Sequence, residues 1–232
     1  IGKLENLSRS PNKGGHALQT TALNQPRALP LIDGDGYLYC SGVSGNYATL
    51  DSPILPNSSF DVTIDFVWGG LINNSLDRQT LIAQYLSPDS NRFFVSIKQD
   101  DSTISLYHGG SYVYSSEIVI VGRNTVRLTY DGATLVLYLN DVQAATKSAS
   151  GIQQEPTYLG SVNLATERPF KGAIFSVTEG SNTNIDFTAT NSPRHGATKF
   201  KCATNQIVTI NQDSSSSNDV ATIIKRPVLR FD

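Results

Sequence analysis

The sequence predicts an all-β fold, a sandwich of two antiparallel sheets. Short apolar runs recur along the chain with a period of two residues, which is the period of a half-buried strand. Gly, Asn, Asp and Ser gather between these runs, where turns are expected. No window shows a convincing helical period over more than two turns. Many short strands at this spacing favour two packed sheets.

The segment FDVTIDFVW, residues 60–68, shows the alternation most clearly. One face of this predicted strand is apolar and the other is polar, so we expect one buried and one solvated face. The apolar face carries Phe60, Val62, Ile64, Phe66 and Trp68. In chain order, the expected strands are residues 36–41, 46–51, 60–68, 79–85, 92–98, 103–107, 111–121, 124–130, 134–140, 156–160, 170–178, 184–189, 198–202, 206–210 and 222–231.

The segment NTVRLTYDGATLVLYLNDVQ, residues 124–143, predicts a β-hairpin with one buried face. Asp131 and Gly132 tolerate the positive φ of a tight turn, and the sequence alternates on both sides of them. A lone hairpin is marginal in water, so we expect this one to belong to a larger sheet. The residues expected to face the core are Val126, Leu128, Tyr130, Leu135, Leu137 and Leu139.

The chain is expected to have three parts. Residues 1–30 are polar and contain several glycines and prolines, which predict an extended N-terminal arm. Residues 31–190 are expected to form the sandwich. Residues 191–232 are expected to form a C-terminal β extension that contacts the sandwich or neighbouring subunits. Pro227 would confine its last strand to an edge or split it.

Composition excludes several classes of partner. The formal net charge is -2 and the 18 Lys and Arg are scattered, so we do not expect nucleic acid to bind. No apolar run reaches the roughly 18 residues of a membrane span, so no membrane insertion is expected. The N-terminus lacks the apolar core of a signal peptide. The chain begins with Ile1 and has no methionine, which favours a processed product or part of a longer protein.

The sequence favours neither a metal nor another cofactor. Cys40 and Cys202 are far apart and have no Cys-x-x-Cys or His pair nearby, so zinc is not expected. Two buried free thiols are favoured over a disulfide, which would require neighbouring strands. The stretch DGDG, residues 33–36, begins like a calcium loop but lacks the downstream acidic ligand of an EF-hand. A Gly-rich turn is therefore favoured there, with calcium as the alternative.

No catalytic constellation is apparent, so we expect the chain not to be an enzyme. A nucleophilic serine on a Gly-x-Ser-x-Gly elbow is absent from the sequence. The nearest pair of carboxylates, Asp61 and Asp65, is better explained as solvated groups on the outer face of a strand. His16, His108 and His195 lie beside Gly or Ala in turn-like contexts, which favours satisfied surface histidines over a triad or a metal cluster.

Aromatic side chains are the remaining functional signal. Several lie in the Gly-containing hairpin LYHGGSYVYSS, and aromatic faces can stack on sugar rings. The alternative is that these tyrosines pack on the sheet with their hydroxyls at its rim. The loops VWGGLINNSLDRQ and SVNLATERPF add amides and a guanidinium that suit glycan hydroxyls. The predicted glycan-binding residues are Tyr107, His108, Tyr112, Tyr114, Asn73, Asn74 and Arg168.

Several segments, taken in order, resemble the laminin-G-like, concanavalin A-like jelly rolls, particularly those of bacteriophage tail and other virion proteins. They are FDVTIDFVW, TLIAQY, RFFVSIKQDDSTISLYHGG, NTVRLTYDGATLVLYLNDVQ and PTYLGSVNLATERPFKGAIFSVTEG. The stretch SPNKGGHALQTTALNQPRALPLIDGDGYLYCSG is similar to the opening segment of the phage domains. The resemblance covers residues 10–180. Asn140-Asp141-Val142 departs from it, where an Asp-Gly turn is usual, and DGDGYLYC replaces a run of acidic residues.

This resemblance implies a jelly roll that serves as a non-enzymatic structural and adhesive virion protein of a bacteriophage, in a tail fibre, tail appendage or capsid decoration. The implied partners are other virion proteins, copies of the chain itself in a homo-oligomer, and host-surface glycan during attachment. The implied location is the virion. Two alternatives remain, a secreted laminin-G-like adhesion module and a glycan-processing enzyme.

Overall fold

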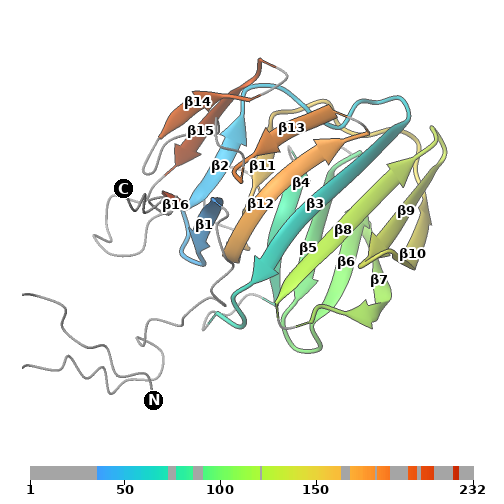
Figure 1. The fold of residues 1–232 in the computed structure, drawn as a ribbon. Coiled ribbons are helices and arrows are strands. Elements are labelled where there is room, and N and C mark those ends of the chain that lie inside the picture. The colour runs from blue at the N-terminus through green and yellow to red at the C-terminus, as the bar shows by residue number, and fades with distance from the viewer. Residues whose placement is uncertain are drawn as a thin grey trace, which may run out of the picture. The chain divides into compact units, whose positions relative to one another are not determined.

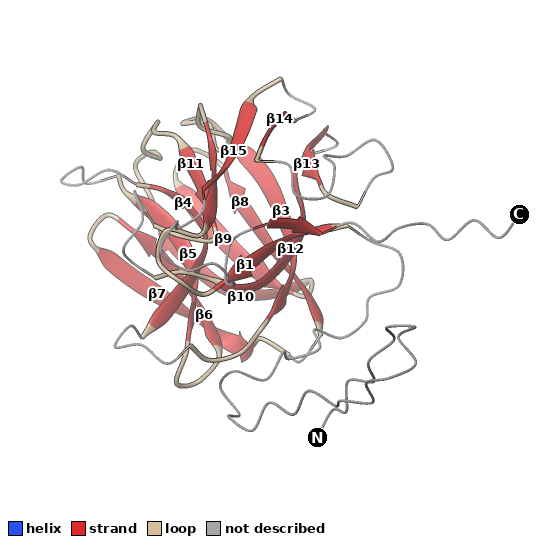
Figure 2. Ribbon diagram, turned by 90° about the vertical axis from the view of Figure 1, so that its left-hand side faces the viewer, coloured by secondary structure: helices blue, strands red, loops and turns tan. Residues whose placement is uncertain are grey.

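Two antiparallel sheets make up the described part of the chain (Figure 1). In it there are strands, turns and loops but no helix, as Figure 2 shows. Consequently none of these residues belongs to a helix that could span a membrane. The predicted all-β sandwich is confirmed. The computed structural model describes residues 36–72, 77–85, 91–120, 122–162, 168–180, 182–188, 198–202, 205–211 and 222–224.

The first sheet lies in front in Figure 1 and has the strand order β10-β9-β8-β3-β12-β1-β16, with β13 paired to β12. Its strands are β1 (Tyr37–Ser41), β3 (Phe60–Trp68), β8 (Arg123–Tyr130), β9 (Thr134–Leu139), β10 (Val142–Ser148), β12 (Lys171–Glu179), β13 (Asn182–Asp186) and β16 (Thr222–Ile224).

The second sheet lies behind the first in Figure 1 and has the order β14-β15-β2-β11-β4-β5-β6-β7. Its strands are β2 (Tyr47–Leu50), β4 (Arg78–Gln84), β5 (Phe93–Lys98), β6 (Thr103–His108), β7 (Ser111–Ile118), β11 (Thr157–Leu159), β14 (Lys199–Lys201) and β15 (Ile207–Asn211).

The core lies between the two sheets. β3 alternates as predicted, with its apolar residues buried and its polar residues outside, and Trp68 at its end packs half-buried against the core. Every second residue of the facing strands completes this layer, because side chains alternate along a strand. The largest fully buried side chains in the core are Phe66, Phe93, Phe170, Phe187, Leu38, Leu50, Leu55, Ile64, Leu81 and Ile82.

Residues 124–143 form the predicted hairpin, which is β8, β9 and the start of β10. All the residues that the alternation assigned to the core are buried, and Leu128 lies directly opposite Leu137. On its other side β8 pairs with β3. The hairpin is therefore part of the larger sheet that its marginal stability requires.

Short polar residues form the turns of this region. The Asp131 carboxylate accepts hydrogen bonds from two following backbone N–H groups, at 2.9 and 2.7 Å. Gly132 has φ 97°, a left-handed conformation that glycine adopts at little cost. Between β9 and β10, Asn140 and Asp141 have φ 51° and 67°. An Asn-Asp pair thus takes the left-handed positions of a two-residue hairpin turn.

The described parts of residues 191–232 belong to both sheets. β14 and β15 extend the second sheet beside β2, whereas β16 pairs with β1 at the edge of the first sheet. The C-terminal segment therefore contributes strands to the sandwich itself. The predicted arm, residues 1–30, and Pro227 lie outside the described residues.

Both cysteines are buried and neither forms a disulfide, as the sequence favoured. Burial raises the pKa of the Cys40 thiol to about 12, so the thiol stays protonated. A β carbon added at Gly160 would lie 2.8 Å from the sulfur of Cys40, which shows how closely the thiol packs against backbone. Cys40 therefore acts as a small core residue.

Replacement of Leu137 by alanine is expected to lower the free energy of unfolding by about 2 to 5 kcal/mol, because a fully buried side chain is lost and a cavity remains. Thr129→Ala is the matched control, with an expected change within about 0.5 kcal/mol, because Thr129 faces outward from β8. Urea unfolding followed by Trp68 fluorescence measures both. Equal losses at the two positions would mean that the register of the hairpin is one residue out.

Candidate functional site

One row of side chains crosses the outer face of the second sheet from edge to edge. Residues directly opposite each other on neighbouring strands project to the same side of a sheet. Ile82, Val95 and Leu106 are such neighbours and face the core, so the residues next to them along each strand face outward. From β14 to β7 the outward row is Lys199, Thr209, Thr49, Tyr158, Ala83, Phe94, Tyr107 and Tyr112.

Five aromatic residues gather where this row crosses β4 to β7, and we call them the aromatic cluster: Tyr85, Phe94, Tyr107, Tyr112 and Tyr114. Phe94 and Tyr107 stack with ring centroids 4.5 Å apart and an interplanar angle of 10°. Tyr112 lies edge-on to both, at 5.8 and 4.9 Å. Such pairs contribute about 0.5 to 1.5 kcal/mol beyond their buried area, so they fix the β6–β7 hairpin against β5.

Two partly exposed arginines lie over the aromatic cluster. Arg92 donates a hydrogen bond from Nη1 to the Tyr85 hydroxyl at 2.9 Å and another from Nη2 to the Tyr107 hydroxyl at 3.1 Å. The guanidinium carbon of Arg168 lies 5.0 Å from the centroid of the Phe94 ring. A guanidinium over a ring face gains cation–π attraction, which holds both side chains on this face.

Backbone hydrogen bonds place Arg168 over the sheet. Its carbonyl oxygen accepts a hydrogen bond from the N–H of Thr80 in β4, at 2.9 Å. Before it in the chain, the N–H of Gly160 donates to Leu81 at 3.0 Å, and after it the N–H of Phe170 donates to Gly160 at 2.9 Å. Arg168 has φ 62°, which is uncommon for a residue with a β carbon. The chain around Arg168 therefore holds a conformation that the residue itself does not prefer.

Arg78 lies on this face as well, packed against Tyr112 and Tyr114. Its guanidinium lies 4.2 Å from the centroid of the Tyr112 ring, and Nη2 donates to the Tyr114 hydroxyl at 2.8 Å. Its Nη1 forms an ion pair with Asp77. Because the Arg78 side chain is only 9% exposed, it braces the tyrosines and offers little to a ligand.

Some of the basic side chains on this face are paired with carboxylates and others are not. The Lys98 amine lies 2.8 Å from a carboxylate oxygen of Asp100 and 2.8 Å from one of Asp101. The hydrogen bond from Lys98 is the main reason that the pKa of Asp101 is lowered to about 2. By contrast, no carboxylate in the described ranges forms an ion pair with Arg92 or Arg168.

The structure brings together four of the residues that the sequence singled out for glycan binding: Tyr107, Tyr112, Tyr114 and Arg168. Of these, Tyr107, Tyr112 and Arg168 are half-buried and Tyr114 is exposed. The rings pack against one another on the sheet, and the Tyr107 and Tyr114 hydroxyls accept hydrogen bonds from Arg92 and Arg78. Glycan binding by these residues stays a prediction. Asn73 and Asn74 lie outside the described residues.

His108 does not lie on this face, and its grouping with the tyrosines is corrected by the structure. It follows Tyr107 in β6, so its side chain points to the opposite side of the sheet. Its Nε2 donates to the Gly151 carbonyl at 2.6 Å, and the residue is 3% exposed. His108 is therefore a satisfied buried histidine, not the surface histidine that we expected. His16 and His195 lie outside the described residues.

Sequence reasoning missed Arg92, Phe94 and Tyr85, which are central to the face. A signal for the first two was present in RFFVSIK, residues 92–98, where alternate residues share a face. With Phe93 directed to the core, Arg92 and Phe94 must both point outward. The sequence did not show which strands lie beside this one, and those strands carry the tyrosines that contact Arg92 and Phe94.

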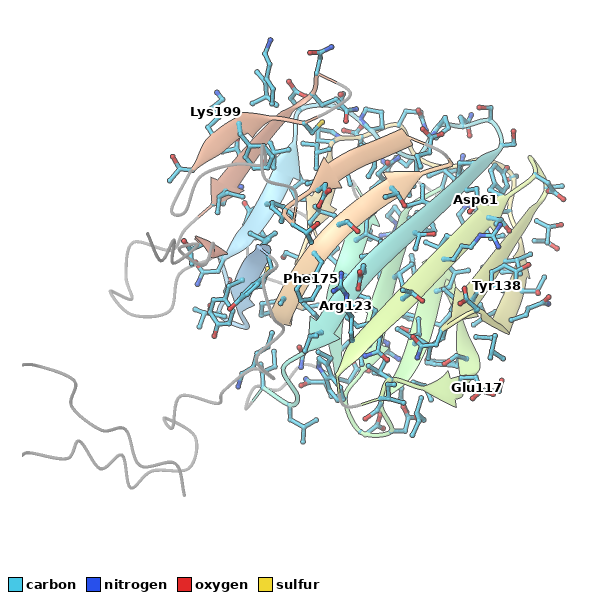
Figure 3. The ribbon with its side chains drawn as sticks, viewed as in Figure 1. Asp61, Glu117, Arg123, Tyr138, Phe175 and Lys199 are labelled. Atoms are coloured by element: carbon cyan, nitrogen blue, oxygen red, sulfur yellow. The ribbon has the colours of Figure 1, made fainter. Side chains whose placement is uncertain are left out.

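Asp61 and Asp65 lie on the outer face of the first sheet, on the opposite side of the sandwich. Asp61 is labelled in Figure 3. Arg127 binds Asp61 with two hydrogen bonds of 2.8 and 2.6 Å, and Arg123 donates from Nε to Asp65 at 2.8 Å. The hydrogen bond from Arg127 lowers the pKa of Asp61. No group of three or more His, Cys, Asp and Glu in the described part of the chain could hold a metal ion.

Comparisons with known proteins show the fold. No family model and no curated protein matches the sequence. A solved structure from Bacteroides ovatus, a protein to which carbohydrate binding has been ascribed, matches with a TM-score of 0.53 and 16% identity, over 80% of this chain and 60% of that one. The LG1-3 region of the laminin alpha2 chain matches with a TM-score of 0.50 and 14% identity, over 76% of this chain and 34% of that one. The chain thus has the laminin-G-like sandwich fold, and it spans less than two thirds of either matched chain.

Stability is expected to fall as the pH is lowered from 7 to 5, in part because of His108. Burial lowers the pKa of His108 below its ordinary value of 6.5, which the unfolded chain regains. Between the two pKa values the unfolded state binds more protons, so the free energy of unfolding decreases as the pH falls through about 6.5.

The variant His108→Gln tests this origin, because it keeps an N–H donor for Gly151 and removes the titrating group. Urea unfolding at pH 7 and pH 5 should show a smaller decrease in the variant than in the wild type. A wild-type protein that is equally stable at both values would contradict the expectation.

Proposed function

We propose that this chain is a lectin-like module that binds carbohydrate on the outer face of its second sheet. The observation that carries the proposal is the aromatic cluster with Arg92 and Arg168 over it. Tyrosine hydroxyls and guanidinium N–H groups suit sugar hydroxyls, and ring edges offer apolar contact. The fold shared with a protein to which carbohydrate binding has been ascribed supports the same function.

The site would act as a rigid, open surface. Ring contacts and hydrogen bonds already order its side chains, so a ligand would lose little binding free energy to their immobilisation. An open face buries little of a ligand, however, which keeps the affinity of a single site low. Display in many copies would multiply that affinity.

We also propose that the module works without catalysis in a bacteriophage particle, as part of a tail fibre, tail appendage or capsid decoration. The sequence resemblance over residues 10–180 supports this role. A glycosidase needs an acid with a raised pKa, whereas hydrogen bonds lower the pKa values of Asp61, Asp101 and Asp131, so none of these three carboxyl groups suits that role.

The double variant Tyr112→Ala, Tyr114→Ala is expected to weaken glycan binding by at least about tenfold, because it removes two rings of the cluster and frees Arg78. Binding of multivalently displayed protein to a panel of bacterial surface polysaccharides measures the loss. Tyr138→Ala, on the outer face of the first sheet, is the matched control and should bind like the wild type. If the wild type binds no polysaccharide of the panel, the adhesive function is wrong.

The virion role predicts that the chain is present in many copies in purified phage particles, held there by contacts with other virion proteins and with itself. Quantitative mass spectrometry of such particles measures the copy number. Recovery of the chain solely as a free secreted protein would contradict this role and favour the secreted adhesion module.

A further inference from the structure

The centre of the aromatic cluster is closed to a stacking sugar ring. Phe94 is 1% exposed, with Tyr107 stacked on it at 4.5 Å and the Arg168 guanidinium 5.0 Å from its centroid. The Tyr112 ring is likewise covered in part by Arg78 at 4.2 Å. A ligand that approaches Phe94 therefore meets the Arg168 guanidinium and the Tyr107 ring first.

We infer that the ligand of this face is an anionic glycan, whose carboxylate or sulfate groups are bound by Arg92 and Arg168. This inference rests on the proposed function and names its class of ligand. Arginine binds such groups through paired, charge-assisted hydrogen bonds, which are roughly twice as strong as bonds between neutral groups. Neutral sugar hydroxyls would leave both positive charges uncompensated.

The geometry of Arg92 supports this role. A guanidinium carries five N–H groups, and in Arg92 the two tyrosine hydroxyls accept only one from each terminal nitrogen. Each terminal nitrogen therefore keeps a second N–H for a ligand. The tyrosines also fix the plane of the guanidinium, so little side-chain entropy is lost when an anion binds.

The other face of the molecule shows that these two charges are unusual. Arg123 and Arg127 also lie over aromatic rings, at 4.3 and 5.3 Å, but each is bound to an aspartate. An arginine over a ring is thus not in itself a sign of a ligand. What distinguishes Arg92 and Arg168 is that no aspartate or glutamate of the described ranges pairs with them.

Nucleic acid, the other common polyanion, fits this face poorly. Single strands bind through bases that stack on open aromatic faces, and the central ring here, Phe94, is buried. Nucleic-acid sites also carry a broad basic stripe, whereas this chain has a formal net charge of -2 and scattered Lys and Arg. A glycan with spaced charges needs neither feature.

The test compares charged glycans with neutral counterparts of the same sugar backbone: polygalacturonate with its methyl ester, and dextran sulfate with dextran. The full chain, displayed multivalently, should bind a charged member at least about tenfold more tightly than its neutral counterpart. This preference should weaken as the salt concentration rises. Arg92→Gln and Arg168→Gln should each reduce the affinity for that charged glycan about tenfold.

Arg127→Gln removes a guanidinium from the opposite face and should leave the affinity unchanged. Arg92→Lys keeps the charge but loses the planar fork, so its affinity should lie between those of the wild type and Arg92→Gln. Urea unfolding of each variant checks its folding. If Arg92→Gln is destabilised, the affinity of Arg92→Lys still tests the role of the guanidinium.

The outcomes separate this inference from the function on which it rests. Equal binding to charged and neutral glycans would overturn the anionic ligand and leave a carbohydrate-binding module. Binding to none of the four glycans, nor to any surface polysaccharide, would overturn both. A preference for a single-stranded oligonucleotide over both charged glycans would overturn the inference in favour of nucleic acid.

Discussion

Each strand of the second sheet must direct alternate side chains toward the first sheet, and this constraint determines what the outer face presents. In β5 the core takes Phe93, Val95 and Ile97, so Phe94 can only point outward. β4 obeys the same rule with one adjustment. Its register shifts between Thr80 and Ile82, and the extra residue changes which positions face outward. Without that bulge, Arg78 and Ala83 could not lie on the same face, and the outer row would be interrupted beside Phe94.

The inner face of β4 explains why this strand can serve as a rigid base for the site. The Gln84 side chain is fully buried and its oxygen accepts hydrogen bonds from the N–H groups of Ile54 and Leu55, at 3.1 and 2.7 Å. Its amide nitrogen donates to the carbonyls of Leu55 and Gln153 at 3.0 and 2.8 Å. A buried amide left unpaired would cost about 1 to 3 kcal/mol, so these hydrogen bonds tie the loops to β4. The loops that close one end of the sandwich thus hold the strand whose other face carries part of the site.

The sequence predicted what depends on alternation within one strand and failed where the answer depends on neighbouring strands. The buried face of the hairpin and the amphipathic β3 follow from period two alone, and both are present as expected. The same rule, applied to β6, would have separated His108 from Tyr107, because consecutive residues face opposite sides. The alternation of side chains along β6 would have been a better guide to which residues share a face than their closeness in sequence. Arg92 was missed for a different reason: its role depends on Tyr85 and Tyr107, which reach it only through the pairing of β4, β5 and β6.

The two outer faces of the sandwich differ in how the charges of their arginines are paired. Each covers exposed sheet with long side chains, and each sets guanidiniums over aromatic rings. On the first sheet, β3 places aspartates diagonally across from the arginines of β8, so the positive charges are neutralised within the protein. On the second sheet, the corresponding neighbours of Arg92 are the tyrosines Tyr85 and Tyr107, which orient the guanidinium and leave its charge in place. An aspartate in place of Tyr85 or Tyr107 would form an ion pair with Arg92 and neutralise its charge. The tyrosines beside Arg92 therefore leave a positive charge to which the proposed anionic ligand could bind, whereas on the opposite face Arg123 and Arg127 are paired with aspartates.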